Sequence, residues 1–290
     1  MRAWSASTGC GSADPVAANA STLPTSRTGR ILLWLVSGLV LLFLITPLLV
    51  IVPLSFSSGT MLTLPLPGYS PRWYEELAGS APWRNSLVNS LIVGSMAATL
   101  ATVLGTLTAL GLARAEFPGK SLLMGILISP MIVPLVIVAA GAYFFLLPLG
   151  LTNSLLGLAL IHAALGAPFV LITVAATLSG LDRSLPRAAA SLGARPTEAF
   201  RRVTLPLIAP GVISGALFAF ITSFDEVVVA IFLTGPQQRT LPRQMFDGLR
   251  DNISPTILAV ATLLILVAVM LLATVEFLRR RNLRIRGISG

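Results

Sequence analysis

The sequence predicts an all-α polytopic membrane protein with six transmembrane helices. Of its 290 residues, 55% are hydrophobic and 11% are charged, whereas soluble domains carry about a quarter charged residues. The apolar residues gather in runs long enough to cross a bilayer, which takes about 20 residues of helix. The net charge of +9 does not indicate nucleic-acid binding, because the basic residues lie in short loops between apolar runs and form no continuous basic surface.

The first 84 residues predict a tail, one transmembrane helix and an outer loop. Residues 1–28 are rich in Ala, Ser, Thr and Gly without periodicity, which is typical of a disordered segment. The apolar run 31–54 exceeds the length of a signal-peptide core, so it is expected to remain as the only span of the segment 29–84. The loop after it carries four aromatic residues of the kind that favour the membrane interface, namely Tyr69, Trp73, Tyr74 and Trp83.

Residues 85–278 predict a core of five further helices. The second span, 85–113, carries small residues that allow close helix packing in a bilayer, namely Gly94, Ala97, Ala98, Ala101 and Gly105. The third span, 121–147, contains Pro130 and Pro134, which predict a kinked or broken helix. The remaining spans are expected at 153–178, from the end of a loop at 179–206 up to Leu233, and at 255–277. A basic tail follows at 279–290, and its arginines are expected to meet anionic lipid headgroups.

The basic residues predict which side of the membrane each loop faces. Six spans place both termini and the loop 179–206 on one side, and that side holds 15 of the 20 basic residues. The other side keeps five arginines: Arg72, Arg84, Arg239, Arg243 and Arg250. Because short cytoplasmic loops carry an excess of Lys and Arg, both termini and the loop 179–206 are expected in the cytoplasm, which also holds ATP.

Few residues could support enzyme chemistry. A single cysteine, Cys10, and a single histidine, His162, cannot build a disulfide within the chain or a Cys/His metal site. No nucleophile motif lies near His162, which is expected to make a hydrogen bond between packed helices. The run Gly119-Lys120-Ser121 resembles the end of a phosphate-binding P-loop, but the first glycine of that motif would fall at position 114, which is arginine. The chain is therefore expected to be no enzyme, to need no cofactor and to take its energy from a partner or an ion gradient.

Asp225 and Glu226 are the acidic residues that lie well inside an apolar run. An acidic group at the centre of a span costs about 2.5–3.5 kcal/mol on insertion scales, so such residues usually face a cavity or a partner charge. Neighbours on a helix point about 100° apart, so the two carboxylates cannot both face one pocket without local unwinding. With Phe224 able to offer a cation–π face, these residues predict a site for a cation, about 12 Å of helix from the outer end at Leu233. An ion pair with a partner subunit or a hydrogen bond between helices is the alternative.

The segment from Arg187 to Pro206, RAAASLGARPTEAFRRVTLP, predicts a helix, a sharp turn and a second short helix. Ala188 to Leu192 favours a helix, Gly193 offers a left-handed stop, and Pro196 suits the first turn of the next helix. Leu205-Pro206 is expected to end that helix, because proline cannot continue a helix made before it. A short double helix of this kind is suited to fit a groove on another protein.

This segment resembles the EAA loop of ABC-importer permease subunits in the spacing of Ala188-Ala189, Gly193, Val203 and Leu205-Pro206. The sequence departs from the family at Arg187, which stands where the family has glutamate. The run FAFITSFDEVVVAIFLTGP followed by TLP resembles the spermidine/putrescine branch of that family. The resemblance extends over residues 85–272.

The resemblance implies the fold and the partners of an ABC type I importer permease in the bacterial inner membrane. Two cytoplasmic ATPases would hydrolyse ATP and dock on the loop 179–206, a second permease subunit would share the path, and a periplasmic binding protein would deliver a polyamine. The residues implied to contact the ATPase are Arg187, Ala188, Ala189, Gly193, Arg195, Glu198, Leu205 and Pro206, and those implied to contact substrate are Phe224, Asp225 and Glu226.

Other functions remain open at this point. A self-sufficient, proton-coupled secondary transporter or channel could use the two carboxylates, but it predicts inverted repeats, and no convincing repeat is present. Another small organic solute could replace the polyamine on a similar frame. The sequence also leaves open whether the second permease is a copy of this chain, and whether Arg187 meets an acidic patch on the ATPase or only solvent.

Overall fold

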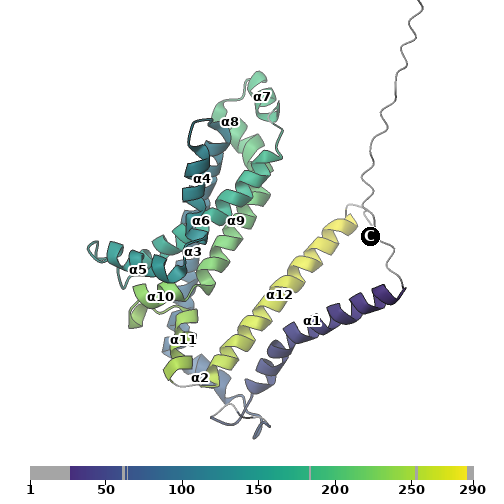
Figure 1. Cartoon of the computed structure of the whole chain (residues 1–290), viewed down its shortest axis with the longest axis vertical. Coiled ribbons are helices and arrows are strands. Elements are labelled where there is room, and N and C mark those ends of the chain that lie inside the picture. Colours follow the sequence, from purple (N-terminus) through teal and green to yellow (C-terminus); the bar gives the residue numbers. More distant parts are fainter. Residues whose placement is uncertain (1–26, 61–62, 64, 183, 252–253, 286–290) are drawn as a thin grey trace, which may run out of the picture. The chain divides into compact units, whose positions relative to one another are not determined.

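The computed structural model describes residues 27–60, 63, 65–182, 184–251 and 254–285, and these residues are almost entirely helical (Figure 1). The described residues contain no β-strand, only one isolated antiparallel bridge between Ser57 and Tyr69. The chain divides into two compact units at Val50. The first holds most of α1 (Arg27–Leu54), a helix of 28 residues with no buried residue. The predicted tails lie mostly outside the described residues, although α1 already begins at Arg27 and the last helix continues to Ile285.

The centre of the second unit is a bundle of three long helices, α3 (Ala81–Arg114), α6 (Leu155–Ser179) and α9 (Leu205–Asp225), which pack against one another (Figure 1). The start of α6 is fixed by Ser154, whose hydroxyl accepts a hydrogen bond of 2.9 Å from the N–H of Gly157, as expected of a capping serine. Pro82 occupies the first turn of α3, where its missing N–H costs no hydrogen bond.

Glycines at the crossing points let these three helices approach closely. A Cβ atom on Gly105 of α3 would lie 2.8 Å from Cβ of Val170, and one on Gly166 of α6 would lie 2.9 Å from Cβ of Ala219. A Cβ atom on Gly215 of α9 would lie 2.7 Å from Cα of Val170. Real Cβ atoms do not approach so closely, so no larger residue fits at this glycine seam of Gly105, Gly166 and Gly215. The predicted small-residue face of the second span is confirmed, because Gly94, Ala97, Ala101 and Gly105 are buried.

The predicted break in the third span is also confirmed. It consists of α4 (Lys120–Ile128), a 3₁₀ turn (Ser129–Met131) and α5 (Leu135–Leu146), and the two parts are bent by 97°. Proline lacks a backbone N–H, so Pro130 and Pro134 remove donors that a continuous helix would need. Pro134 precedes α5 with an extended backbone, at φ −55° and ψ 128°.

The number of spans is lower than predicted when it is judged by length and composition. Four helices are long and apolar enough to cross a membrane: α1, α3, α6 and the run Pro196–Asp225. The bent pair makes a fifth span if it crosses as one, and the apolar part of α12 (Thr256–Ile285) is the shorter stretch Thr256–Met270. Within the described residues the order of apolar helices agrees with the prediction, while six full spans are not reached.

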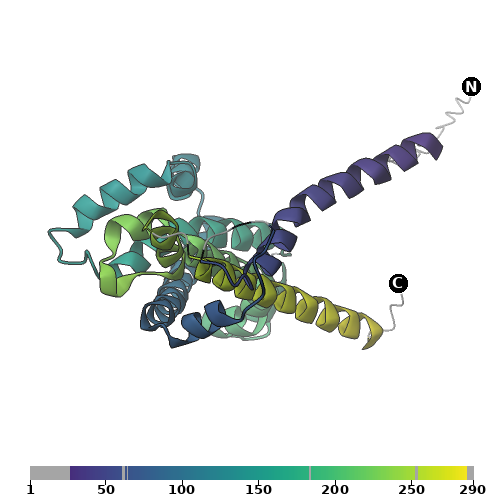
Figure 2. The same ribbon diagram turned by 90° about the horizontal axis from the view of Figure 1, so that it is seen from below.

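Short helices close the end of the bundle opposite to the loop 179–206. These are α2 (Arg72–Gly79), α10 (Val228–Leu233), a 3₁₀ turn (Pro236–Gln238) and α11 (Leu241–Asp251). The short α10 packs against α5 and α6 (Figures 1 and 2). Trp73 of α2 is buried, and its indole Nε1–H donates a hydrogen bond of 2.7 Å to the carbonyl of Ser57. Its ring is therefore packed within this chain.

Two sequence predictions about α9 are wrong. The fifth span does not run to Leu233, because α9 ends at Asp225, Glu226 is extended (φ −74°, ψ 121°) and α10 begins anew. At the other end, Leu205-Pro206 does not terminate a helix. The chain passes from α8 (Pro196–Ala199) through a π turn (Phe200–Thr204) directly into α9. In a regular α-helix the proline ring clashes with the carbonyl four residues back, and the wider π turn ahead of Pro206 gives that carbonyl more room.

Candidate functional site

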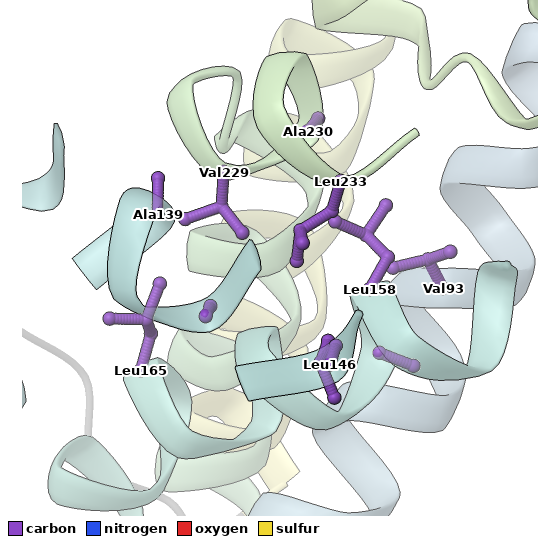
Figure 3. Packing of buried hydrophobic residues seen from close by; sticks show 10 residues of the cluster. Val93, Ala139, Leu146, Leu158, Leu165, Val229, Ala230 and Leu233 are labelled. Carbon is purple, nitrogen blue, oxygen red and sulfur yellow. The ribbon is translucent and has the colours of Figure 1, made fainter. Parts of the chain in front are cut away.

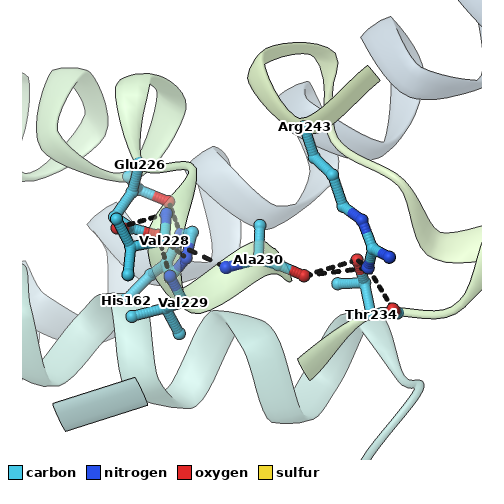
Figure 4. Close-up of polar contacts among 8 residues, drawn as sticks. His162, Glu226, Val228, Val229, Ala230, Thr234 and Arg243 are labelled. Atoms are coloured by element: carbon cyan, nitrogen blue, oxygen red, sulfur yellow. Dashed lines mark hydrogen bonds and ion pairs between the residues drawn. The ribbon is translucent and has the colours of Figure 1, made fainter. Parts of the chain in front are cut away.

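The break between α9 and α10 is held by the side chain of Glu226. Its carboxylate accepts hydrogen bonds from the backbone N–H groups of Val228 (2.9 Å), Val229 (2.8 Å) and Ala230 (3.4 Å) (Figure 4). The first N–H groups of a helix have no partner inside that helix. Non-helical backbone at membrane depth is tolerated only where such groups are satisfied by protein or water. Glu226 therefore makes the break possible within an apolar run.

The same carboxylate lies beside the single histidine. Nε2 of His162 is 3.6 Å from Oε2 of Glu226, and the two side chains are 0% and 5% exposed. Nδ1 of His162 forms a hydrogen bond of 2.8 Å with the hydroxyl of Ser223, which confirms the predicted packing hydrogen bond. His162 comes from α6 and Ser223 from α9. This buried polar cluster of His162, Ser223 and Glu226 therefore joins the break to the neighbouring long helix.

Asp225 and Glu226 differ sharply although they are adjacent. The backbone leaves the helix between them, which is the local unwinding that two facing carboxylates require, yet it directs them to different surroundings. Asp225 is exposed and has no ion-pair partner among the described residues, whereas Glu226 is buried. Phe224 is half-buried, and its ring stacks on Phe220 with ring centroids 5.8 Å apart. The predicted 12 Å of helix between Asp225 and the outer end is absent, because α9 stops at Asp225.

The far end of α10 is capped by a second charged side chain, whose role no sequence motif indicates. The guanidinium of Arg243, on α11, donates to the carbonyl of Ala230 at 3.0 Å and to the carbonyl and hydroxyl of Thr234 (Figure 4). Burial lowers the pKa of Arg243, and the nearby carboxylate of Asp247 acts in the opposite direction. Arg239 pairs with the same Asp247 at 3.2 Å. Both ends of α10 are thus fixed by charged groups.

The apolar side of α10 is packed as firmly as its ends are capped. Val229, Ala230 and Leu233 are buried in a cluster with Leu146 of α5 and Leu158 of α6 (Figure 3). Leu233 and Leu158 are 1% and 0% exposed. A six-residue helix has little stability of its own, so this packing and the two charged caps together hold α10 in place.

The predicted double helix lies at the opposite end of α9 (Figure 1). The first of its helices, α7 (Ser184–Ser191), is followed by a turn in which Gly193 has φ +88°. The N–H groups of Gly193 and Ala194 donate to the carbonyls of Ala190 and Ala189, at 3.0 Å each, which is the Schellman arrangement expected of a glycine stop. Pro196 opens α8 as predicted. At the start of α7, Asp182 accepts a hydrogen bond of 2.8 Å from the N–H of Ser184, which lowers the pKa of Asp182.

Most of the residues predicted to contact an ATPase are exposed on this segment. Glu198 pairs with Arg202 at 3.2 Å, one helical turn away, on the protein surface. Arg187 forms no ion pair with any residue that the structure describes. Exposed members of the predicted set are Arg187, Ala188, Gly193, Arg195, Leu205 and Pro206, while Ala189 and Glu198 are half-buried. The segment and Asp225 are joined by one uninterrupted helical run of 30 residues, Pro196–Asp225.

A bundle of apolar spans with an exposed double helix at one end and a broken span at the other is typical of the membrane subunit of a transporter. Comparison with known proteins gives the family. Residues 101–284 match the binding-protein-dependent transport system inner membrane components, and the chain belongs to that family. It is therefore an inner-membrane component of a binding-protein-dependent transport system, as the resemblance of the EAA-like loop indicated.

The chain is also similar in sequence to three named permease proteins. The chain is 36% identical over 232 residues to the putrescine transport system permease protein PotI of Escherichia coli K12, covering 77% of this chain and 82% of that protein. It is 32% identical over 240 residues to the spermidine/putrescine transport system permease protein PotC of Haemophilus influenzae, covering 83% and 93% of the two chains. The trehalose transport system permease protein SugB of Mycobacterium tuberculosis is 33% identical over a shorter stretch of 150 residues, 52% of this chain and 55% of that protein.

One solved structure confirms the fold. A chain of a bacterial ABC transporter involved in the import of the acidic polysaccharide alginate superposes with a TM-score of 0.68, covering 87% of this chain and 97% of that chain. The sequence identity is 16%, so the match shows the architecture alone. The predicted class, an all-α polytopic permease of the ABC importer type, is confirmed.

Proposed function

We propose that this chain is a translocation subunit of an ATP-driven importer that carries polyamines such as putrescine or spermidine into the cytoplasm. The observation that supports this substrate class is Asp225, an exposed carboxylate without an ion-pair partner among the described residues, which follows the aromatic residue Phe224 in the sequence. A cationic amine suits both groups, since it can pair with the carboxylate and rest on the aromatic face. The names of the relatives PotI and PotC support the same class.

The frame by itself does not select the substrate. Relatives and structural neighbours on the same frame are named for trehalose and for alginate, which are uncharged and acidic compounds. Selection must therefore come from the side chains in the path. We assign the contact with the cation to Asp225 and Phe224. Glu226 was predicted to share that contact, and we assign it to holding the break, because its oxygens already accept backbone N–H groups.

The partners follow from membership in a binding-protein-dependent system. Two cytoplasmic ATPases dock on the loop 179–206, a second permease subunit completes the path, and a periplasmic binding protein delivers the substrate at the α10–α11 end. The chain then lies in the bacterial inner membrane with both termini in the cytoplasm, as the distribution of its basic residues predicts. ATP is hydrolysed in the partner, and this chain needs no cofactor.

The continuous helical run from Pro196 to Asp225 suggests how the two ends work together. It contains 30 residues, and at 1.5 Å per residue it is about 45 Å long. When the ATPase pair closes against α7 and α8, the run moves as a unit and displaces Asp225 at its far end. The break at Glu226 allows Asp225 to move while α10 stays in place, because α10 is fixed by Arg243 and by its packing.

The test is uptake of labelled putrescine and spermidine by cells with and without the gene, in one arm depolarised and in the other depleted of ATP. Uptake that requires the gene and ATP but survives depolarisation supports the importer. Uptake that follows the membrane potential favours a secondary transporter instead. If uptake of neither polyamine depends on the gene, the proposed substrate is wrong, while the family and the fold stand.

A further inference from the structure

A cavity of about 600 Å³ lies at the loop end of the bundle, at the opposite end of α9 from Asp225. Its walls come from the end of α3, the start of α4 and the end of α6, with α7 and the π turn beside them. Much of this wall is apolar and is formed by Leu110, Leu112, Met124 and Leu178. The cavity therefore offers an apolar surface next to the loop segment.

The charged residues that line this cavity are mostly basic. Arg114, Lys120 and Arg187 are three cations, and Glu116 is the single carboxylate among the lining residues. Lys120 donates one hydrogen bond of 2.9 Å from Nζ to the carbonyl of Ala115, which leaves its other donors available. Neither Arg114 nor Arg187 forms an ion pair within the part of the chain that the structure describes. The three cations outnumber the one carboxylate, so the cavity has an excess of positive charge.

We propose that this cavity binds an anionic phospholipid of the cytoplasmic leaflet. The phosphate group pairs with the three cations, and part of an acyl chain covers the apolar wall. Basic pockets between transmembrane helices on the cytoplasmic side are suited to anionic headgroups, and a free phosphate would leave the apolar wall unused. The cavity lies at the end of the bundle where the basic residues gather, which the positive-inside rule places in the cytoplasm.

This site gives Arg187 a role that the loop sequence left open. Arg187 stands on α7, at the position where the resembling family has glutamate, and it lines the cavity together with two further cations. A glutamate there would bring a second carboxylate to the site and repel the phosphate. The lipid therefore holds α7, the first helix of the loop 179–206, against the end of α3 and the start of α4. This role does not depend on which solute the subunit carries.

The experiment is native mass spectrometry of the full-length chain, purified with the subunits that accompany it and titrated with phosphatidylglycerol or phosphatidylcholine. We expect one tightly bound phosphatidylglycerol and clearly weaker binding of phosphatidylcholine. Lys120→Gln should weaken the binding of phosphatidylglycerol about fivefold, the usual contribution of one basic residue near an anionic lipid, and Arg187→Glu should weaken it more. Arg201→Gln is the matched control, because Arg201 is an exposed arginine of the same loop that does not line the cavity.

Several outcomes overturn the proposal. Equal affinity for the two lipids, or an equal loss in Arg201→Gln, shows only a diffuse surface charge. Displacement of the lipid by millimolar inorganic phosphate shows a site for a free anion. If Arg187→Glu retains the lipid and instead loses the ATPase subunit during purification, Arg187 contacts an acidic patch on that partner. Circular dichroism of each variant accompanies the titrations, and Arg187→Gln replaces Arg187→Glu if the latter does not fold.

Discussion

The two ends of α9 differ in how the sequence relates to the continuity of the helix. Towards the loop end α9 contains two prolines, Pro206 and Pro210, and the helical run continues through both of them. At the other end the sequence SFDEVVV contains neither proline nor glycine, and the helix breaks after Asp225. A wider turn accommodates the proline ring at the first end, while a carboxylate replaces the missing helical hydrogen bonds at the second.

This difference teaches that in α9 the position of the break depends on where backbone donors find partners, and that proline alone does not break this helix. Pro206 has no N–H and so needs no acceptor, and the N–H of Leu205 donates to the carbonyl of Phe200 across the π turn. At the break, the N–H groups of Val228 and Val229 find the carboxylate of Glu226. Substitutions at both ends can test whether these accounts are correct.

The largest effect is expected from Asp225→Asn. This change removes the charge proposed to pair with the substrate, and a hydrogen bond to a charged group contributes about 1.5–3 kcal/mol, so uptake efficiency should fall about 10- to 100-fold through a higher KM. The measurement is concentration-dependent uptake in cells with equal amounts of assembled transporter. Asp225→Glu is the control and should retain part of the activity. Normal uptake by Asp225→Asn would remove this residue from the path.

A change at Glu226 should act on stability. In Glu226→Gln the amide oxygen can still accept a backbone N–H, but the NH₂ group that replaces the second oxygen cannot, and the buried N–H left unsatisfied costs about 1–3 kcal/mol. Unfolding of the purified transporter in mixed detergent measures the loss. Glu75→Gln, at an exposed glutamate in the first turn of α2, should leave the stability unchanged. If Glu226→Gln is as stable as the parent, the break is held by packing alone.

The hydrogen bond between His162 and Ser223 should contribute less. We expect a coupling free energy of about 0.5–1.5 kcal/mol in a double-mutant cycle of His162→Leu and Ser223→Ala, the usual value for one hydrogen bond. The same unfolding measurement applies to both single variants and the double variant. Additive effects of the two changes would mean that the 2.8 Å contact does not stabilise the break.

The smallest effect is expected from Pro206→Ala at the loop end. Pro206 is exposed and its position in the first turn of α9 requires no donor, so the stability should change by less than about 1 kcal/mol. Thermal unfolding of the purified transporter provides the measurement. A loss as large as that of Glu226→Gln would show that the proline ring itself maintains the π turn, and that the contrast between the two ends is smaller than described.

Much of the fold could be predicted because local chemistry decided it. Gly193 stops α7, Pro196 starts α8, and Pro130 and Pro134 lie in the sharp bend between α4 and α5. In each case one residue type imposes its own backbone preference. The resemblance of the loop also led to the correct family.

The break at Glu226 could not be predicted by the same reasoning, because it depends on a side chain that turns back to its own backbone. A carboxylate followed by a new apolar run, here EVVVAIFL, is a weak sign of a helix start, and it competes with the simpler interpretation of one long span. The contacts of Glu226 with His162, 64 positions earlier, and of Arg243 with Thr234 depend on tertiary packing. The predicted cation contacts and ATPase contacts remain predictions.

The glycine seam of Gly105, Gly166 and Gly215 has a consequence for how the subunit can change shape. Helices in contact through side chains can slide by small rotamer changes, but backbones that touch at single glycines have no such freedom. A shift of one residue along α9 would drive a side chain into the backbone of α6, where a Cβ atom would already lie 2.7 Å from Cα of Val170. The seam therefore opposes sliding of α9 along α6, so the proposed movement of the run Pro196–Asp225 takes the form of a tilt rather than a slide.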